Sequence, residues 1–116
     1  MEEYSVKDII KIKDLQAKRD QVRRFFLMIK HEFKKEELLL KKHAVPDINY
    51  HTKLHDELIR TMISFEDQLD TVSEFEIDKM ILFVHLTFNQ HEDICGEFTK
   101  SFIRIKEYML EVENAQ

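Results

Sequence analysis

The sequence predicts an all-α protein, a bundle of long helices. It holds one glycine and one proline in 116 residues, and turns draw heavily on both residue types, so the chain can form few turns and its elements must be long. Apolar residues recur at steps of three and four, which is the spacing of one helix face. With 43% apolar and 35% charged residues, the chain can bury a single core, and we expect one domain over residues 1–116.

We expect the first helix to span residues 5–42. Ser5 and Asp8 form a weak capping box at its start. The polar segment AKRDQ, residues 17–21, is where this helix would bend or break. Its second half keeps one apolar face, made of Val22, Phe25, Ile29, Phe33 and Leu40.

The second helix is expected over residues 47–70. The segment HAVPDIN is the clearest turn in the chain. Pro46 and Asp47 suit the opening of the helix that follows it. The apolar face of this helix begins with two histidines and then continues in leucine, methionine and phenylalanine: His51, His55, Leu58, Met62, Phe65 and Leu69.

The third helix is expected over residues 73–112. Ser73 can cap its first turn, and the Glu76 side chain can accept a hydrogen bond from the Ser73 backbone N–H in return. Gly96 lies inside the pattern and costs about 1 kcal/mol relative to alanine. The apolar face is interrupted by one histidine: Ile81, Val84, Phe88, His91, Cys95, Phe98, Phe102, Ile105 and Met109.

Composition excludes several classes of protein. No apolar run approaches the roughly 20 residues of a membrane span, and the acidic start MEEYSVKDII is unlike a signal or transit peptide. A single cysteine, Cys95, rules out an internal disulfide framework, so we expect a cytoplasmic protein. The lone glycine argues against a phosphate-binding loop, and nothing near Cys95 marks an oxyanion site. We therefore expect no enzyme.

Charge is distributed unevenly along the chain. Residues 1–42 carry 12 Lys and Arg against 8 Asp and Glu, whereas residues 43–116 carry 6 against 15. This asymmetry favours packing within the chain or within a homodimer. Because the basic residues are interleaved with acids and the total charge is -5, no nucleic-acid partner is expected.

Side chains that can bind metals interrupt the apolar faces. A buried carboxylate is costly unless it is protonated or paired, and imidazole nitrogens and carboxylate oxygens are ligands for Fe, Zn or Mn. Helical bundles often house such sites in their cores. The alternative is that these groups are hydrogen-bonded or lie at solvated edges. Six residues are candidate ligands: Glu32, Glu36, His51, His55, His85 and His91.

Two segments resemble a known family. Residues 32–58, EFKKEELLLKKHAVPDINYHTKLHDEL, resemble the central segment of bacterial hemerythrin-like proteins, in which His-Phe-x-x-Glu-Glu precedes a Tyr-Pro-like turn and a helix that opens with H-x-x-x-H. Residues 81–90, ILFVHLTFNQ, resemble the last ligand helix, with His85 in the histidine position. The matching residues of the first segment are Phe33, Glu36, Glu37, Pro46, His51 and His55.

This resemblance implies a four-helix bundle with a non-heme diiron centre that binds O2 between five histidines and two bridging carboxylates. Glu36 would then bridge or ligate. Terminal nitrogen ligands would come from His51, His55 and His85.

The sequence departs from the family pattern at three points. Glu32 replaces a histidine and could act as a carboxylate substitute, Gln90 stands where the family has a bridging aspartate, and the first ligand helix has no counterpart. His91 could replace a lost ligand. We expect the fourth position of the bundle to be filled either by a first helix broken at residues 17–21 or by a homodimer partner.

The expected function is that of a hemerythrin-type non-heme iron protein with a diiron centre, which binds O2 or a related small ligand for sensing, storage or delivery. The alternative is a metal-free helical interaction module with a decayed metal site. A ferritin-like oxidase ranks last, because such sites use Glu-x-x-His and neither EELL nor ELIR supplies it.

Overall fold

The computed structural model describes residues 5–44, 48–93 and 97–115, and these residues form α-helices and no strand. The prediction of an all-α protein is confirmed. Pro46, Asp47, Cys95 and Gly96 lie outside the described residues. The helices are α1 (Val6–Lys11), α2 (Leu15–Lys42), α3 (Ile48–Gln68), α4 (Glu74–His91) and α5 (Glu97–Ala115).

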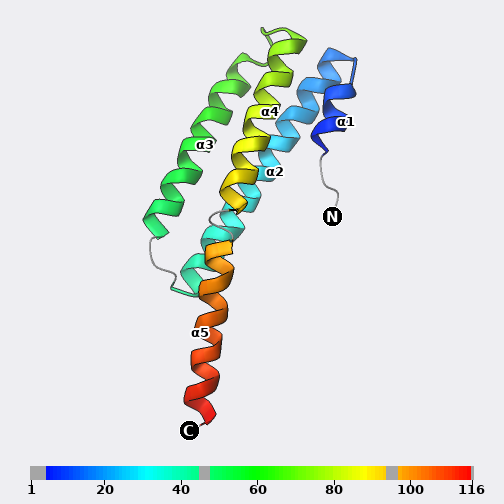
Figure 1. Ribbon diagram of the computed structural model, residues 1–116. Helices are drawn as coiled ribbons and strands as arrows, with labels where there is room; N and C mark the ends of the chain where they lie inside the picture. The colour runs from blue at the N-terminus through cyan, green and yellow to red at the C-terminus, as the bar shows by residue number, and fades with distance from the viewer. Residues whose placement is uncertain (1–4, 45–47, 94–96, 116) are drawn as a thin grey trace.

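The body of the fold is an up-down bundle of α2, α3 and α4 (Figure 1). The apolar face predicted for residues 22–40 is buried between these helices, because its phenylalanines and aliphatic side chains pack against α3 and α4. The core contributed by α3, by the turn that follows it and by α4 consists of Leu58, Met62, Leu69, Ile77, Met80, Ile81 and Val84.

The predicted first helix is broken, but at residues 12–14 and not at residues 17–21. Asp14 caps the start of α2, since its carboxylate accepts a hydrogen bond of 2.9 Å from the Ala17 backbone N–H. At the start of α1, Ser5 makes no such side-chain cap. The polar segment 17–21 therefore forms the first turns of α2.

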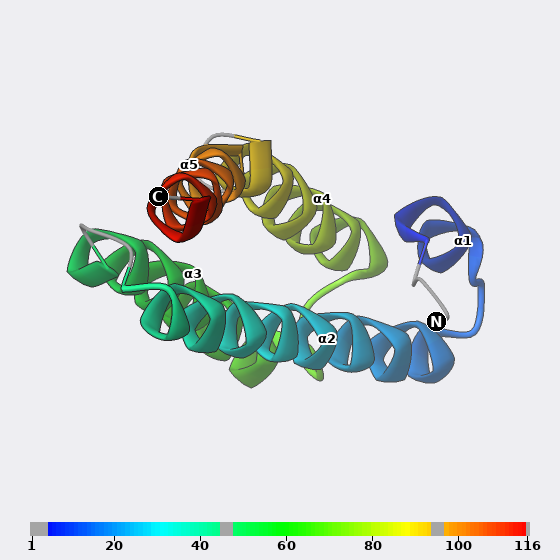
Figure 2. The same ribbon diagram turned by 90° about the horizontal axis from the view of Figure 1, so that it is seen from below.

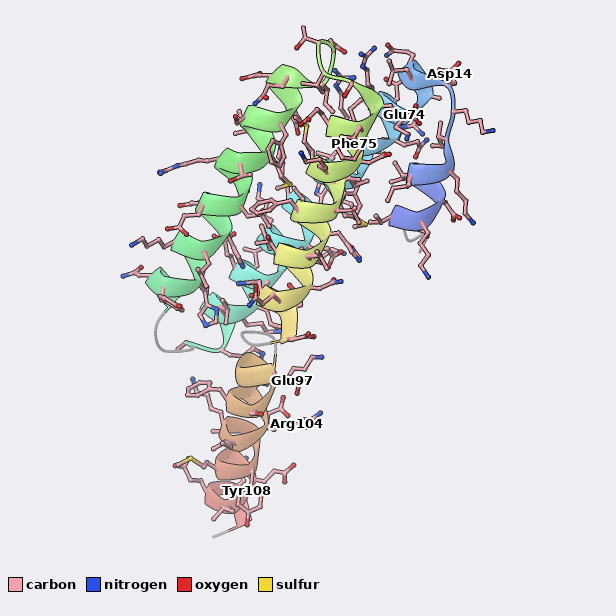
Figure 3. The ribbon with its side chains drawn as sticks, turned by 45° about the horizontal axis from the view of Figure 1, so that its top comes forward. Asp14, Glu74, Phe75, Glu97, Arg104 and Tyr108 are labelled. Carbon is pink, nitrogen blue, oxygen red and sulfur yellow. The ribbon has the colours of Figure 1, made fainter. Side chains whose placement is uncertain are left out.

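Lys18 explains why the polar segment stays helical. Its side chain is fully buried, and its Nζ donates to the Ile10 carbonyl at 3.0 Å, to Glu74 at 2.8 Å and to Asp78 at 2.9 Å. One ammonium group thus joins the end of α1, the start of α2 and the start of α4. Figure 3 shows Asp14 and Glu74 at this same end of the molecule.

α1 packs against α2 and α4 and so takes part of the position of a fourth helix. It has 6 residues whereas α2 has 28, so it covers only one end of the bundle (Figure 1). Of the two expected ways to fill the fourth position of the bundle, the structure therefore has the broken first helix, with the break at residues 12–14 instead of residues 17–21.

The prediction of a single third helix over residues 73–112 is wrong, because the structure has two helices there, α4 and α5. α4 begins as expected, since Ser73 Oγ accepts the Glu76 backbone N–H at 3.3 Å, but it ends at His91 and its backbone widens into a π-turn at Glu92 and Asp93. A π-turn interrupts the regular hydrogen-bond ladder of an α-helix. α5 then runs past the end of the bundle, on the same side of the molecule as α4 (Figures 1 and 2).

The resulting molecule is long and thin, with extents of 63 × 26 × 18 Å. Within the described ranges, no helix combines the length and the apolar character that a membrane crossing would require.

Candidate metal centre

Three helices bring a carboxylate and two imidazoles together at the end of the bundle away from α1. Glu36 comes from α2, His55 from α3 and His91 from the last position of α4, and one ligand atom of each lies within 4.8 Å of the others. The Nε2 atoms of His55 and His91 are 2.8 Å apart. Glu36 Oε1 lies 3.3 Å from His91 Nε2 and 3.4 Å from His55 Nε2. We call these three residues the ligand cluster.

The cluster is buried because each member lies on the core face of its helix. Their side chains are 12%, 0% and 7% exposed for Glu36, His55 and His91. Phe33, one turn before Glu36, stacks on the His55 ring at 4.0 Å between centroids and meets the His91 ring edge-on at 5.5 Å. This phenylalanine therefore holds both imidazoles in orientation from the apolar side.

Two further carboxylates border the cluster. Glu37 Oε2 lies 3.4 Å from His55 Nδ1 without completing a hydrogen bond. Glu92, in the π-turn after α4, shares a hydrogen bond with Glu36. Glu92 is not among the six ligands predicted from the sequence, although its place four residues after Phe88 puts it on the apolar face of that helix.

The protonation of the cluster follows from these contacts. Burial acts to raise the pKa of the Glu36 carboxyl, but hydrogen bonds from His55 and His91 outweigh it and hold that pKa well below its usual range. Burial and the hydrogen bond to Glu36 raise the pKa of Glu92 to about 7. For His55, burial acts to lower the pKa, and the Glu36 carboxylate more than reverses this, so the pKa is raised.

His51 lies one turn before His55, is 4% exposed, and has its ring centroid 6.4 Å from that of His91. It is therefore next to the ligand cluster without being one of its three members.

The remaining two candidate ligands lie outside the cluster. The Glu32 side chain is 34% exposed and pairs with Lys35 Nζ at 3.4 Å. His85 Nε2 lies 3.2 Å from the amide nitrogen of Asn89. On α4 the structure thus brings His91 to the cluster, whereas the family pattern places its histidine at His85.

A cavity of about 370 Å³ opens beside the cluster, between α3 and α4. Phe33 and His91 belong both to its lining and to the surroundings of the cluster, and Gln90 lines it as well. The other lining residues are Tyr50, Leu54, Glu57, Leu58, Thr61, Phe83 and Thr87. The cavity gives small molecules an approach to His91 from the surface.

No family model matches the chain, and neither a curated protein nor a solved structure does. The likeness of residues 32–58 and 81–90 to hemerythrin-like proteins therefore stays a prediction. The ligand cluster is the feature of the described residues that bears on function.

The metal-free protein should lose stability as the pH rises from about 4.5 to about 7. Across this range the unfolded chain releases the Glu92 proton, whereas the folded protein keeps it because the pKa of Glu92 is raised from 4.5 to about 7. The raised pKa of His55 acts in the same direction. Protonated His55 stabilises the folded protein fully below pH 6.5, and this stabilisation is lost as the pH rises through the pKa of His55 in the folded protein. Urea denaturation with a chelator present, over a pH series, measures this slope.

Glu92→Gln should flatten the slope, because glutamine cannot release a proton. The matched control is Glu32→Gln, which changes a partly exposed carboxylate outside the ligand cluster and should leave the slope as it is. A slope that is unchanged in Glu92→Gln would contradict the assignment.

Proposed function

We propose that this chain is a metal-binding helical protein that holds a transition-metal ion, iron by preference, between Glu36, His55 and His91. The observation that carries the proposal is the spacing of the three donors, at 2.8, 3.3 and 3.4 Å. Nitrogen and oxygen ligands placed about 2.1 Å from one ion lie about 3.0–3.4 Å from one another in octahedral or tetrahedral geometry. Small adjustments of these side chains would therefore complete a coordination shell.

The electrostatics of the cluster also favour a cation. Glu36 is mostly buried and its lowered pKa keeps it ionised. The raised pKa of His55 favours a positive imidazolium beside it, and the raised pKa of Glu92 favours a neutral acid there in place of a second negative charge. A bound cation would take over the role of these protons, as happens when metal binding displaces protons from ligands.

The donor set points to the kind of metal. Two imidazoles and one carboxylate form the set that non-heme Fe(II) sites use while leaving coordination positions open. Bound iron would supply an open position for O2 or another small ligand. The cavity beside His91 supports this use of the site, because it leads from the surface to the cluster.

A dinuclear centre of hemerythrin type is the more specific form of the proposal. A second ion would draw its ligands from the neighbours of the cluster, which are His51, Glu37 and Glu92. Their positions next to the cluster support this form, and the number of ions bound per chain tests it.

The test is a metal titration of protein purified without a histidine tag. Anaerobic Fe(II) should saturate at one ion per chain for the mononuclear site or at two for the dinuclear site, and the visible spectrum should change when O2 is admitted. Saturation without a spectral response to O2 would support metal binding and contradict O2 binding. A titration with no specific binding would overturn the proposal.

The second candidate is a metal-free helical interaction module. Two observations favour it: the direct hydrogen bond between His55 and His91, which pairs the two imidazoles with each other, and the large apolar side chains exposed on α5. Failure of the metal titration would leave this candidate.

A further inference from the structure

α5 carries an exposed apolar stripe. Ile105, Tyr108, Met109 and Val112 are 59%, 67%, 59% and 43% exposed, and their spacing of i, i+3, i+4 and i+7 places them on one helix face. Figure 3 shows Tyr108 on the part of α5 that lies beyond the end of the bundle. Helices owe most of their stability in proteins to the packing of such a face, so a covered stripe would be more stable than this exposed one.

The charges beside the stripe are divided between its two ends. Arg104 and Lys106 precede the centre of the stripe, and Glu111 and Glu113 follow it. Acidic groups stabilise the N-terminal end of a helix and basic groups the C-terminal end. Glu111 and Glu113 therefore lie near the end of α5 that disfavours acidic groups, and a basic group from a helix of opposite polarity would compensate for them.

The stripe and its charges are arranged symmetrically. About the midpoint between Tyr108 and Met109, Ile105 corresponds to Val112, and the basic pair corresponds to the acidic pair at residues 111 and 113. A segment of this kind is complementary to itself when one copy is reversed. Isologous contacts of this type generate closed dimers.

We propose that α5 is a self-association helix, which pairs with α5 of a second copy of this chain in antiparallel orientation. The apolar stripes would face each other, with Ile105 opposite the second copy's Val112. At about 100° per residue, Lys106 and Glu113 lie on one flank of the stripe, while Arg104 and Glu111 lie on the other.

The charges on the two flanks of the stripe favour the antiparallel orientation. In an antiparallel pair, each flank of one helix faces the same flank of the other helix. Lys106 therefore meets the second copy's Glu113, and Arg104 meets the second copy's Glu111. Each pair is offset along the axis by two residues, which is about 3 Å and within reach of long side chains. In a parallel, in-register pair, Lys106 would instead meet Arg104 and the glutamates would meet each other. Opposite charges therefore select the antiparallel dimer.

The rest of the molecule leaves room for this pairing. α5 extends past the bundle (Figure 1), so reversal of the second helix places the two bundles at opposite ends. Lys106 Nζ donates to the His43 carbonyl at 2.6 Å, and an ammonium group has two further donors that can meet the second copy's glutamate.

The experiment is a charge exchange, measured by sedimentation velocity over a concentration series of the full chain. The acidic variant is Arg104→Glu with Lys106→Glu, and the basic variant is Glu111→Lys with Glu113→Lys. Each variant makes all four flank contacts repulsive, so self-association should weaken by at least about tenfold. A mixture of the two variants, and a single chain that carries all four changes, should associate again.

The matched control is Glu107→Lys, a charge reversal on the side of α5 opposite to the stripe, which should leave association unchanged. Circular dichroism of each variant checks that α5 is still helical. A wild-type chain that stays monomeric at every concentration would overturn the inference. So would dimers that persist in both charge variants, or variants that lose association without recovering it on mixing.

Discussion

Replacing His91 with alanine should weaken metal binding by at least about 100-fold, because the loss of a direct ligand should exceed the 10–100-fold effect of losing a neighbouring hydrogen-bond partner. His91 Nε2 is 2.8 Å from His55 Nε2 and 3.3 Å from Glu36 Oε1, so it supplies one of the three donors of the cluster. Anaerobic competition with a chromogenic chelator for Fe(II), repeated with Co(II), measures the change in affinity.

The matched control is His85→Ala, on the same helix. His85 interacts with Asn89 and lies outside the cluster, so its replacement should leave the affinity unchanged. The reverse outcome, with binding lost in His85→Ala and kept in His91→Ala, would favour the arrangement implied by the family resemblance over the cluster.

A companion variant, His51→Leu with His55→Leu, separates the two candidate functions. If the cluster holds a metal, this variant should lose it. If the cluster is a metal-free remnant, the variant should fold with equal or greater stability, because apolar side chains often replace buried polar groups without cost.

Replacing Lys18 with alanine should lower the free energy of unfolding by about 2–4 kcal/mol. The change removes a fully buried side chain and its contacts with Ile10, Glu74 and Asp78. Since the Glu74 and Asp78 side chains are 52% and 25% exposed, water can solvate them in the variant, which keeps the loss below that of a fully buried ion pair. Urea denaturation at neutral pH measures the change.

Lys18→Met separates packing from charge, because methionine retains most of the buried stem. We expect it to cost about 1–2 kcal/mol, which is the hydrogen-bonding part of the loss. As a control, Lys30→Ala removes a half-exposed pair with Glu66 at 3.2 Å and should cost about 0–1 kcal/mol. Equal costs for Lys18→Ala and Lys30→Ala would contradict the structural role of Lys18.

Lys18 also predicts how the stability responds to alkali. Burial acts to lower the pKa of Lys18, but hydrogen bonds to Glu74 and Asp78 outweigh it, so the pKa is raised above 10.5. The stabilisation is therefore fully present at neutral pH and is lost only as the pH rises through the folded value.

The sequence by itself determined the class of fold and the buried faces. One glycine and one proline leave few places for turns, and the apolar spacing of residues 22–40 is local information that a helix converts directly into one face. The same reasoning placed His55 and Glu36 on core faces, where the structure has them.

Only the tertiary structure decided which of these groups meet. His85 and His91 both lie near the apolar face of α4, and the choice between them depends on where that helix ends relative to α2 and α3. The break after α1 rests on contacts between Lys18 and acids 56 and 60 residues away, and the raised pKa of Glu92 arises from its approach to Glu36. Spacing along the chain specifies the face of each helix, whereas distances between helices are set by the packing of all of them together.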